Sequence, residues 1–297
     1  MFQPSDQNVD LSEEEFRLLR DLIHDRFGLY FDASQRGSLR SRLAGRLGSL
    51  DLLSFEDYYH YLRFGPQRTE ELQRMVTHLT NNETYFYREM PQLQVFADTV
   101  LRSIRDAKSP GPDRTLRVLS AGCSTGEEAY TLAMIVYESG QFFWSWDVRV
   151  IGMDVDQVAL EKARRAVYHH NSFRSISPVV KERHFLAAPG GAVQVKEPIR
   201  RLVSFRAGNI VDPASYAGLD PLDVIFCRNV LIYFSDAMIL KVVRVFHEAL
   251  VPGGHLFLGH AESLSRITDL FTPVRFQGAM VYRKPGGPPT RALPAPR

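Results

Sequence analysis

The run VLSAGCSTGEEA, at positions 118–129, holds residue types whose spacing could do chemistry. A short apolar stretch enters a turn of small residues between Gly122 and Gly126, and the acidic pair Glu127 and Glu128 opens a new helical pattern. A strand, a small-residue turn and a helix start form a cradle in which the backbone approaches a ligand closely. The two acids would repel a pyrophosphate that the helix N-terminus otherwise attracts. The turn therefore favours a cationic cofactor, and the first candidate is S-adenosylmethionine, whose amino group and sulfonium both carry positive charge.

An acid ends the second predicted strand: Asp154 follows the first turn by about 30 residues. In dinucleotide-binding folds an acid at this place binds ribose hydroxyls. Asp154 could instead cap the next helix, but Asp156 already fills that role. We therefore favour ribose binding for Asp154.

Polar residues also follow the third and fourth predicted strands. Asn209 and Ile210 follow the third strand and are candidate adenine contacts, with the amide for the base edge and the isoleucine for its face. Arg228 and Asn229 follow the apolar end of the fourth strand, where two large polar side chains are hard to explain as packing. The alternative is that Asn229 caps a turn and Arg228 pairs with a carboxylate. Ligands bind at the carboxyl ends of the strands in such sheets, so these residues are expected at one edge.

The elements that must position these residues alternate between strand and helix after the breaker cluster KSPGPDR. The pattern predicts an α/β fold with a parallel, doubly wound sheet and an antiparallel pair at its end. The gap at 168–201 is long for one crossover and contains Pro-Gly-Gly, so we expect an inserted small β-element at about 170–201. The expected strands are 116–120, 148–153, 202–206, 223–227, 254–258, 272–276 and 279–283, with helices at 127–138, 156–167 and 236–250.

The first 80 residues read as a small helical domain. Ser12 and Glu15 are spaced as a capping box before the first helix, and further helices are expected at about 34–50, 54–64 and 70–79. Residues 81–115 are expected to be a linker and a helix that contribute to the cofactor site, followed by the sheet domain at 116–284. The proline-rich tail at 285–297 is predicted to be disordered.

Four arginines and no acid mark the second helix of that domain: Arg36, Arg40, Arg42 and Arg46. Leucines at helical spacing form its buried stripe, and the arginines fall on both sides of the stripe. The helix is either a solvated amphipathic helix or a cationic docking face for an acidic partner. Residues 1–80 hold 10 basic and 13 acidic residues, so the positive charge is local, which favours docking.

The polar and aromatic segment TNNETYFYR, at 80–88, precedes another helical run. Three aromatic residues beside an arginine suit a binding lip, and they equally suit a domain junction filled by rings. The residues alone leave both interpretations open.

Composition excludes several classes of protein. A formal net charge of +2 is too small to give the whole surface a positive potential that would attract nucleic acids. The two cysteines, Cys123 and Cys227, are too few for a disulfide scaffold. No apolar run approaches the length that spans a bilayer, so we expect a soluble, cytoplasmic protein. No metal-ligand cluster, GxSxG or GxGxxG motif appears, which argues against a metal site, acyl-enzyme chemistry and a nicotinamide cofactor.

Five motifs resemble, in their order and near their spacing, those of the CheR-type chemoreceptor glutamate methyltransferases. They are NNETYFYRE, SAGCSTGEEAYTLAM, IGMDVDQVALEKAR, FCRNVLIYF and PGGHLFLGHAESL, and the resemblance runs from about Leu11 to Lys284. It implies a Rossmann-like class I methyltransferase sheet with S-adenosylmethionine as methyl donor and S-adenosylhomocysteine as product. The cofactor contacts that it implies are Asn82, Thr84, Arg88, Glu127, Asp154, Asn209, Ile210, Arg228 and Asn229. The choice between Glu127 and Glu128 rests on the alignment alone, because a helix turns the two about 100° apart and only one can point inward.

The resemblance also implies a substrate and a partner. A receptor glutamate, already ionised at neutral pH, attacks the methyl group, so no catalytic acid or base is expected. Tyr233 is a candidate for orienting that carboxylate, with core packing as the alternative. The arginine helix would dock on acidic receptor helices, and we expect a monomer that binds no nucleic acid. The alternatives are a methyltransferase of another protein or of a small molecule, and a non-catalytic cofactor-binding adaptor.

Overall fold

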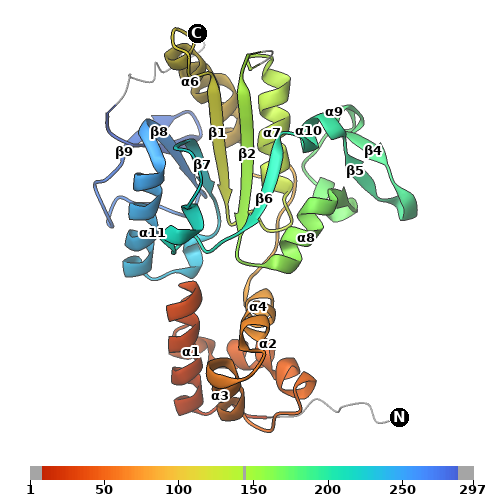
Figure 1. The fold of residues 1–297 in the computed structure, drawn as a ribbon, viewed down its shortest axis with the longest axis vertical. Helices are drawn as coiled ribbons and strands as arrows, with labels where there is room; N and C mark the ends of the chain where they lie inside the picture. The colour runs from red at the N-terminus through yellow and green to blue at the C-terminus, as the bar shows by residue number, and fades with distance from the viewer. Residues whose placement is uncertain (1–8, 143–144, 287–297) are drawn as a thin grey trace.

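The computed structural model describes residues 9–142 and 145–286. Most of the predicted proline-rich tail, residues 287–297, therefore lies outside the described residues. The chain forms a helical unit below a twisted sheet, and the arrows of the parallel strands, such as β1 and β2, point toward the helices (Figure 1). None of the described helices is long and apolar enough to span a bilayer.

Four helices form the N-terminal unit: α1 (Glu13–Phe27), α2 (Arg36–Ser49), α3 (Phe55–Phe64) and α4 (Arg68–Leu79). The predicted capping box is present, because Ser12 accepts from the backbone N–H of Glu15 and the Glu15 carboxylate accepts from that of Ser12. Ser54 caps α3. The apolar faces of the helices enclose a core of their own, separate from the two cores of the sheet.

The main sheet has seven strands in the order β6-β2-β1-β7-β8-β10-β9. The chain runs outward from β1 through β2 to β6, then returns to the other side of β1 with β7, which creates a switch point between β1 and β7. The parallel pairs and the antiparallel β8-β10-β9 end confirm the predicted sheet. The strands are β1 (Thr115–Ala121), β2 (Asp147–Asp154), β6 (Val203–Ala207), β7 (Leu222–Cys227), β8 (Leu250–Leu258), β9 (Thr272–Phe276) and β10 (Ala279–Arg283).

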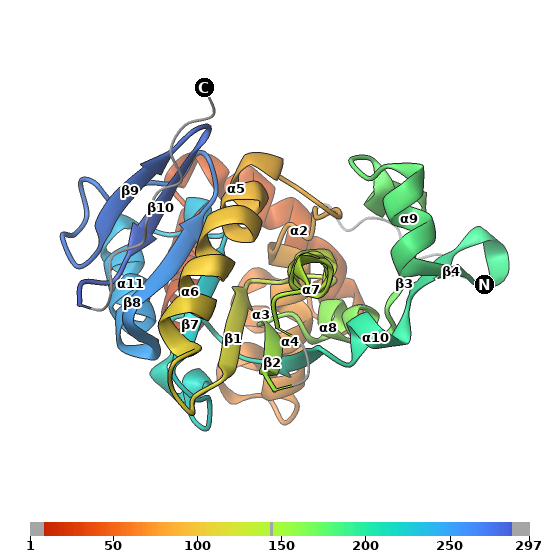
Figure 2. The ribbon, with the colours of Figure 1, turned by 90° about the horizontal axis from the view of Figure 1, so that it is seen from above.

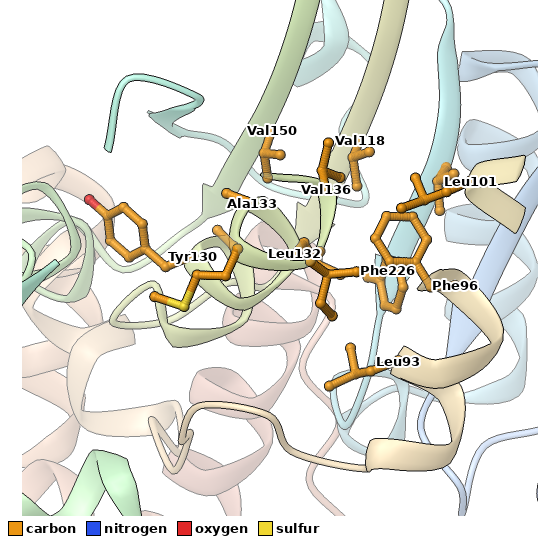
Figure 3. Packing of buried hydrophobic residues seen from close by; sticks show 14 of the residues in the cluster. Leu93, Phe96, Leu101, Val118, Tyr130, Leu132, Ala133, Val136, Val150 and Phe226 are labelled. Carbon is orange, nitrogen blue, oxygen red and sulfur yellow. The ribbon is translucent and has the colours of Figure 1, made fainter. Parts of the chain in front are cut away.

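Helices cover both faces of this sheet. Alternate strand residues point to opposite sides, and buried apolar residues stand on both. On one face, α5 (Met90–Val95), α6 (Leu101–Lys108) and α7 (Glu127–Ser139) pack on the strands (Figures 2 and 3). On the other face, α11 (Asp236–Ala249) packs on residues such as Leu119 and Ile225. α8 (Gln157–Arg165) follows β2 and contacts α4.

The expected β-insert is a three-stranded antiparallel sheet in the order β3-β5-β4. It projects from the edge of the molecule beside α8 and α10 (Glu197–Arg200) (Figures 1 and 2). Its elements are β3 (Val167–Tyr168), α9 (Pro178–His184), β4 (Phe185–Ala187) and β5 (Val193–Val195).

Candidate cofactor-binding site

A cavity opens where the carboxyl ends of β1, β2 and β7 face the helical unit. This is the switch point of the sheet, where α/β proteins bind ligands. The helical unit contributes Phe27, Leu29 and Leu79 to the wall, so the cavity lies between the two parts of the chain. Eight of the nine predicted cofactor residues line it: Asn82, Thr84, Arg88, Asp154, Asn209, Ile210, Arg228 and Asn229.

The ninth predicted residue, Glu127, does not line the cavity, and its neighbour Glu128 does. The Glu127 side chain is buried, and its carboxylate accepts from the hydroxyls of Thr125 at 2.6 Å and Ser172 at 2.8 Å. Burial raises the pKa of this carboxyl. One residue on, a helix has turned by about 100°, so only one of the two acids can face the ligand. Of the two acids, the structure therefore places Glu128 on the cavity wall.

The turn before these acids brings its backbone close to its neighbours. Gly122 has φ +77°, and a Cβ there would lie 2.5 Å from the Val230 side chain. The N–H groups of Gly122 and Cys123 both donate to the carbonyl of Met153, at 2.8 and 3.1 Å. Only glycine suits this conformation and this approach, so the first turn and the segment after β7 form one continuous wall.

Asp154 ends β2 with both carboxylate oxygens held in place. Oδ2 accepts from the N–H of Ser124 at 2.7 Å, and Oδ1 accepts from the N–H of Asp156 at 2.9 Å. The side chain is buried, and burial raises its pKa to about 6. Asp156 is the N-cap of α8, as predicted, which leaves Asp154 to the cavity. Each Asp154 oxygen retains acceptor capacity for a ribose hydroxyl.

Asn82 and Asn209 line the cavity, but their amides also tie parts of the chain together. The Asn82 amide donates to Asp156 at 2.8 Å and accepts from the Ser124 hydroxyl at 3.0 Å. The Asn209 amide donates to the carbonyl of Arg26, at the end of α1, at 2.8 Å. These two residues therefore hold the helical unit and the strand ends in register, a role that the sequence pattern did not indicate.

Arg228 stands at the centre of a buried polar cluster. Its Nε donates to Glu128 at 2.7 Å, its Nη1 donates to the carbonyl of Arg88 at 2.7 Å, and Glu89 lies 3.8 Å away. The alternative raised for this arginine, pairing with a carboxylate, is therefore what the structure contains. The sequence does not indicate Glu89 as a site residue, because only the folded chain brings it close to Arg228.

The Asn229 side chain shows which ligand groups the cavity can satisfy. Its amide nitrogen lies 3.4 Å from Glu89, while its Oδ1 is buried and has no hydrogen-bond partner among the described residues. A buried acceptor without a donor is costly, and a ligand donor would satisfy it. An acceptor here, with the carboxylates of Asp154 and Glu128, fits the amino and hydroxyl groups of S-adenosylmethionine.

The segment TNNETYFYR serves both of the roles that were left open. Thr84, Tyr85 and Arg88 line the cavity. Phe86 is fully buried and packs on rings of the β-insert, including Phe185 with centroids 4.9 Å apart. One side of the segment therefore forms part of the cavity wall, and the other side packs against the β-insert.

The four arginines of α2 do not form one free surface. Arg46 donates to the carboxylate of Glu71 at 2.7 and 2.9 Å, and the Tyr58 hydroxyl donates to the same carboxylate at 2.8 Å. Arg42 donates to the carbonyl of Leu79, at the end of α4. The structure therefore corrects the docking assignment of Arg46, whose side chain is 13% exposed and neutralises a buried acid.

Two family models match almost the whole described chain. The model described as "CheR methyltransferase, all-alpha domain" matches residues 14–80, and "CheR methyltransferase, SAM binding domain" matches residues 82–280. The chain belongs to the CheR methyltransferase family. This CheR-family protein is therefore an S-adenosylmethionine-dependent methyltransferase with a Rossmann-like sheet.

Curated relatives agree with this assignment over most of their length. Chemotaxis protein methyltransferase 2 of Vibrio cholerae is 36% identical over 93% of this chain and 95% of its own. The chemotaxis protein methyltransferase of Escherichia coli is 34% identical over 93% and 92%. The probable biofilm formation methyltransferase WspC of Pseudomonas aeruginosa is 34% identical over 92% of this chain and 63% of its own.

Proposed function

We propose that this CheR-family protein methylates glutamate side chains on the cytoplasmic helices of a chemoreceptor and forms glutamyl methyl esters. The observation that carries the proposal is the cavity itself, which joins the carboxyl ends of the strands to the helical unit, where Arg36 and Arg42 are exposed and Arg40 is half-buried. Relatives named as chemotaxis protein methyltransferases support the choice of substrate. We further propose that the protein acts in the cytoplasm as a monomer.

The cavity residues have distinct proposed roles toward the cofactor, which supplies an electrophilic methyl group on a sulfonium. Asp154 accepts from the ribose hydroxyls, and Glu128 with Asn229 holds the amino group. Arg88 donates one bond to the carbonyl of Glu83 at 2.9 Å, and its guanidinium has further N–H groups for the methionyl carboxylate. Ile210 is 6% exposed and offers an apolar face to the adenine.

The protein's own part in methyl transfer is alignment and the exclusion of water. A glutamate carboxylate is ionised at neutral pH, so it needs no general base. Removing water from that carboxylate and holding it in line with the methyl group lower the barrier. Tyr233 lines the cavity and is our candidate for orienting the carboxylate through its hydroxyl.

For docking, we propose Arg36, Arg40 and Arg42, without Arg46, as the cationic surface for acidic receptor helices. The variant Arg36→Glu/Arg40→Glu should raise the KM for receptor several-fold and leave the affinity for S-adenosylhomocysteine unchanged. Arg102→Glu is the matched control, because it removes an exposed arginine from α6, at the far end of the molecule (Figure 1). An unchanged KM in the double variant would refute the docking surface.

Methylation itself is tested with labelled S-adenosylmethionine and a purified receptor cytoplasmic fragment. The label should enter the receptor as a base-labile ester, and Asp154→Ala should abolish most of the transfer at limiting cofactor. A receptor whose glutamates are replaced by glutamines is the control and should take up no label. Binding of S-adenosylhomocysteine without label in any receptor would contradict the proposal and favour the adaptor alternative.

A further inference from the structure

Glu262 lies outside the set of predicted site residues, yet its carboxylate gathers four backbone N–H groups. Oε2 accepts from Gly259 at 2.6 Å and from Asn229 at 3.0 Å. Oε1 accepts from Val230 at 2.9 Å and from Ile232 at 3.3 Å. The residue is 8% exposed. Backbone N–H groups that converge in this way form an anion-binding concavity, and here a side chain of the same protein fills it.

Three of these four donors belong to the segment 229–232, which forms one wall of the cofactor cavity. Asn229 and Val230 line the cavity directly, and Tyr233 follows them. Asn229 has φ +60°, the left-handed region that few non-glycine residues adopt. Asparagine adopts this region more often than most non-glycine residues, but the region is still less favourable than the ordinary ones, so contacts that hold it add stability. The bonds from Asn229 and Val230 to Glu262 supply that restraint.

A shift of this segment would reach both sides of the cavity. Val230 lies against Gly122 in the first turn, with no room for even one extra carbon atom. On the other side, the N–H of Tyr30 donates to the carbonyl of Tyr233 at 2.9 Å and connects the segment to the helical unit. The segment therefore sets the position of Asn229 Oδ1, which has no hydrogen-bond partner among the described residues, relative to the first turn and to the helical unit.

We propose that Glu262 is a positioning residue whose negative charge holds segment 229–232 in the conformation that binds the cofactor. The inference rests on the proposed function, because it takes the cavity to be the S-adenosylmethionine site. Without the carboxylate, the N–H groups of Asn229, Val230 and Ile232 lose a common acceptor. The segment then relaxes, and the wall of the cavity loses its shape.

The variant Glu262→Gln separates charge from shape. It keeps one oxygen for two of the N–H groups but sets an amide NH₂ against the other two, which are also donors. Glu248→Gln is the matched control, since Glu248 is exposed on α11. We expect Glu262→Gln to weaken S-adenosylhomocysteine binding by about tenfold or more, the loss typical of a bond to a charged group. We expect no change in the control.

Hydrogen exchange in the ligand-free protein gives a readout that does not depend on activity. The amides of Asn229, Val230 and Ile232 should exchange faster in Glu262→Gln than in the wild type or in the control, while the core strands keep their protection. Unchanged exchange at these amides together with unchanged affinity would overturn the proposal. If the wild type bound no S-adenosylhomocysteine, the proposed function would fail instead, and the exchange measurement would still decide the role of Glu262.

Chemical rescue tests whether the charge alone is sufficient. Glu262 also lines a second cavity, together with Gly259, His260 and Tyr282, through which a small anion can reach the vacated place. Formate should therefore restore much of the binding and exchange protection of Glu262→Ala, whereas formamide, neutral and of similar size, should not. Equal effects of formate and formamide would overturn the claim that charge holds the segment.

Discussion

Removal of Arg46 should destabilise the helical unit, because Arg46 neutralises an acid that is almost inaccessible to water. The side chains of Arg46 and Glu71 are 13% and 1% exposed and lie 2.7 Å apart. The bond to Glu71 raises the pKa of Arg46, and burial raises that of Tyr58, which also donates to Glu71. In Arg46→Met the carboxylate keeps only the tyrosine hydroxyl. Breaking a buried pair on one side typically costs about 3–5 kcal/mol.

That cost is large enough to measure by two routes. A loss of about 3 kcal/mol should lower the midpoint of thermal unfolding by about 5 °C if the chain unfolds as one unit, and by more if the helical unit melts alone. Urea unfolding followed by circular dichroism should show a lower midpoint. The matched control is Arg36→Met, which removes an exposed arginine of the same helix and should change little.

A second variant separates the charge from the packing of Arg46. In Arg46→Met/Glu71→Gln no charge remains buried, and the glutamine oxygen still accepts from Tyr58, so most of the lost stability should return. The reasoning is refuted if Arg46→Met is no less stable than Arg36→Met. In that case Arg46 would return to the docking surface.

Three further predictions concern the cofactor cavity and are measured by calorimetry with S-adenosylhomocysteine. Burial raises the pKa of Asp154 to about 6, so its ionised fraction should fall about tenfold between pH 7 and pH 5. The affinity should fall with it, because a protonated carboxyl is a poorer acceptor for the ribose hydroxyls. A wild type as insensitive to pH as Asp154→Asn would contradict this. Glu128→Gln should weaken binding by about 10- to 100-fold, and Glu127→Gln should leave it nearly unchanged; the reverse order would restore the original assignment. Gly122→Ala should weaken binding, because its Cβ would lie 2.5 Å from Val230, and Val230→Ala should recover part of the loss; an additive pair would exclude this contact as the cause.

The sequence was sufficient for the parts of the site that follow from strand topology. The carboxyl ends of parallel strands meet at one edge, so polar residues such as Asp154, Asn209 and Arg228 could be grouped without coordinates. Local signals were equally reliable where one short motif decides the structure, as with the Ser12 capping box.

The rest depended on partners distant in the chain and on rotation within one helix. Arg46 was placed on the docking surface because nothing in a helical repeat indicates that Glu71, 25 residues later, is buried against it. Glu127 and Glu128 differ only by one step around the helix, and the direction of each depends on how α7 sits on the sheet. The sequence gives no sign of the role of Glu262, because its partners are backbone N–H groups, which carry no sequence signal.

Several contacts fix the helical unit relative to the cavity, and this bears on how methyl transfer would work. Thr77 of α4 donates to Asp156 at 2.9 Å, Asn209 donates to the carbonyl of Arg26, and Tyr30 donates to that of Tyr233. Each bond joins the helical unit to a different strand end. A reaction that needs no general base depends mainly on the geometry of approach. The proposed docking helix α2 belongs to the same unit, so receptor docking would set the position of the glutamate relative to the methyl group.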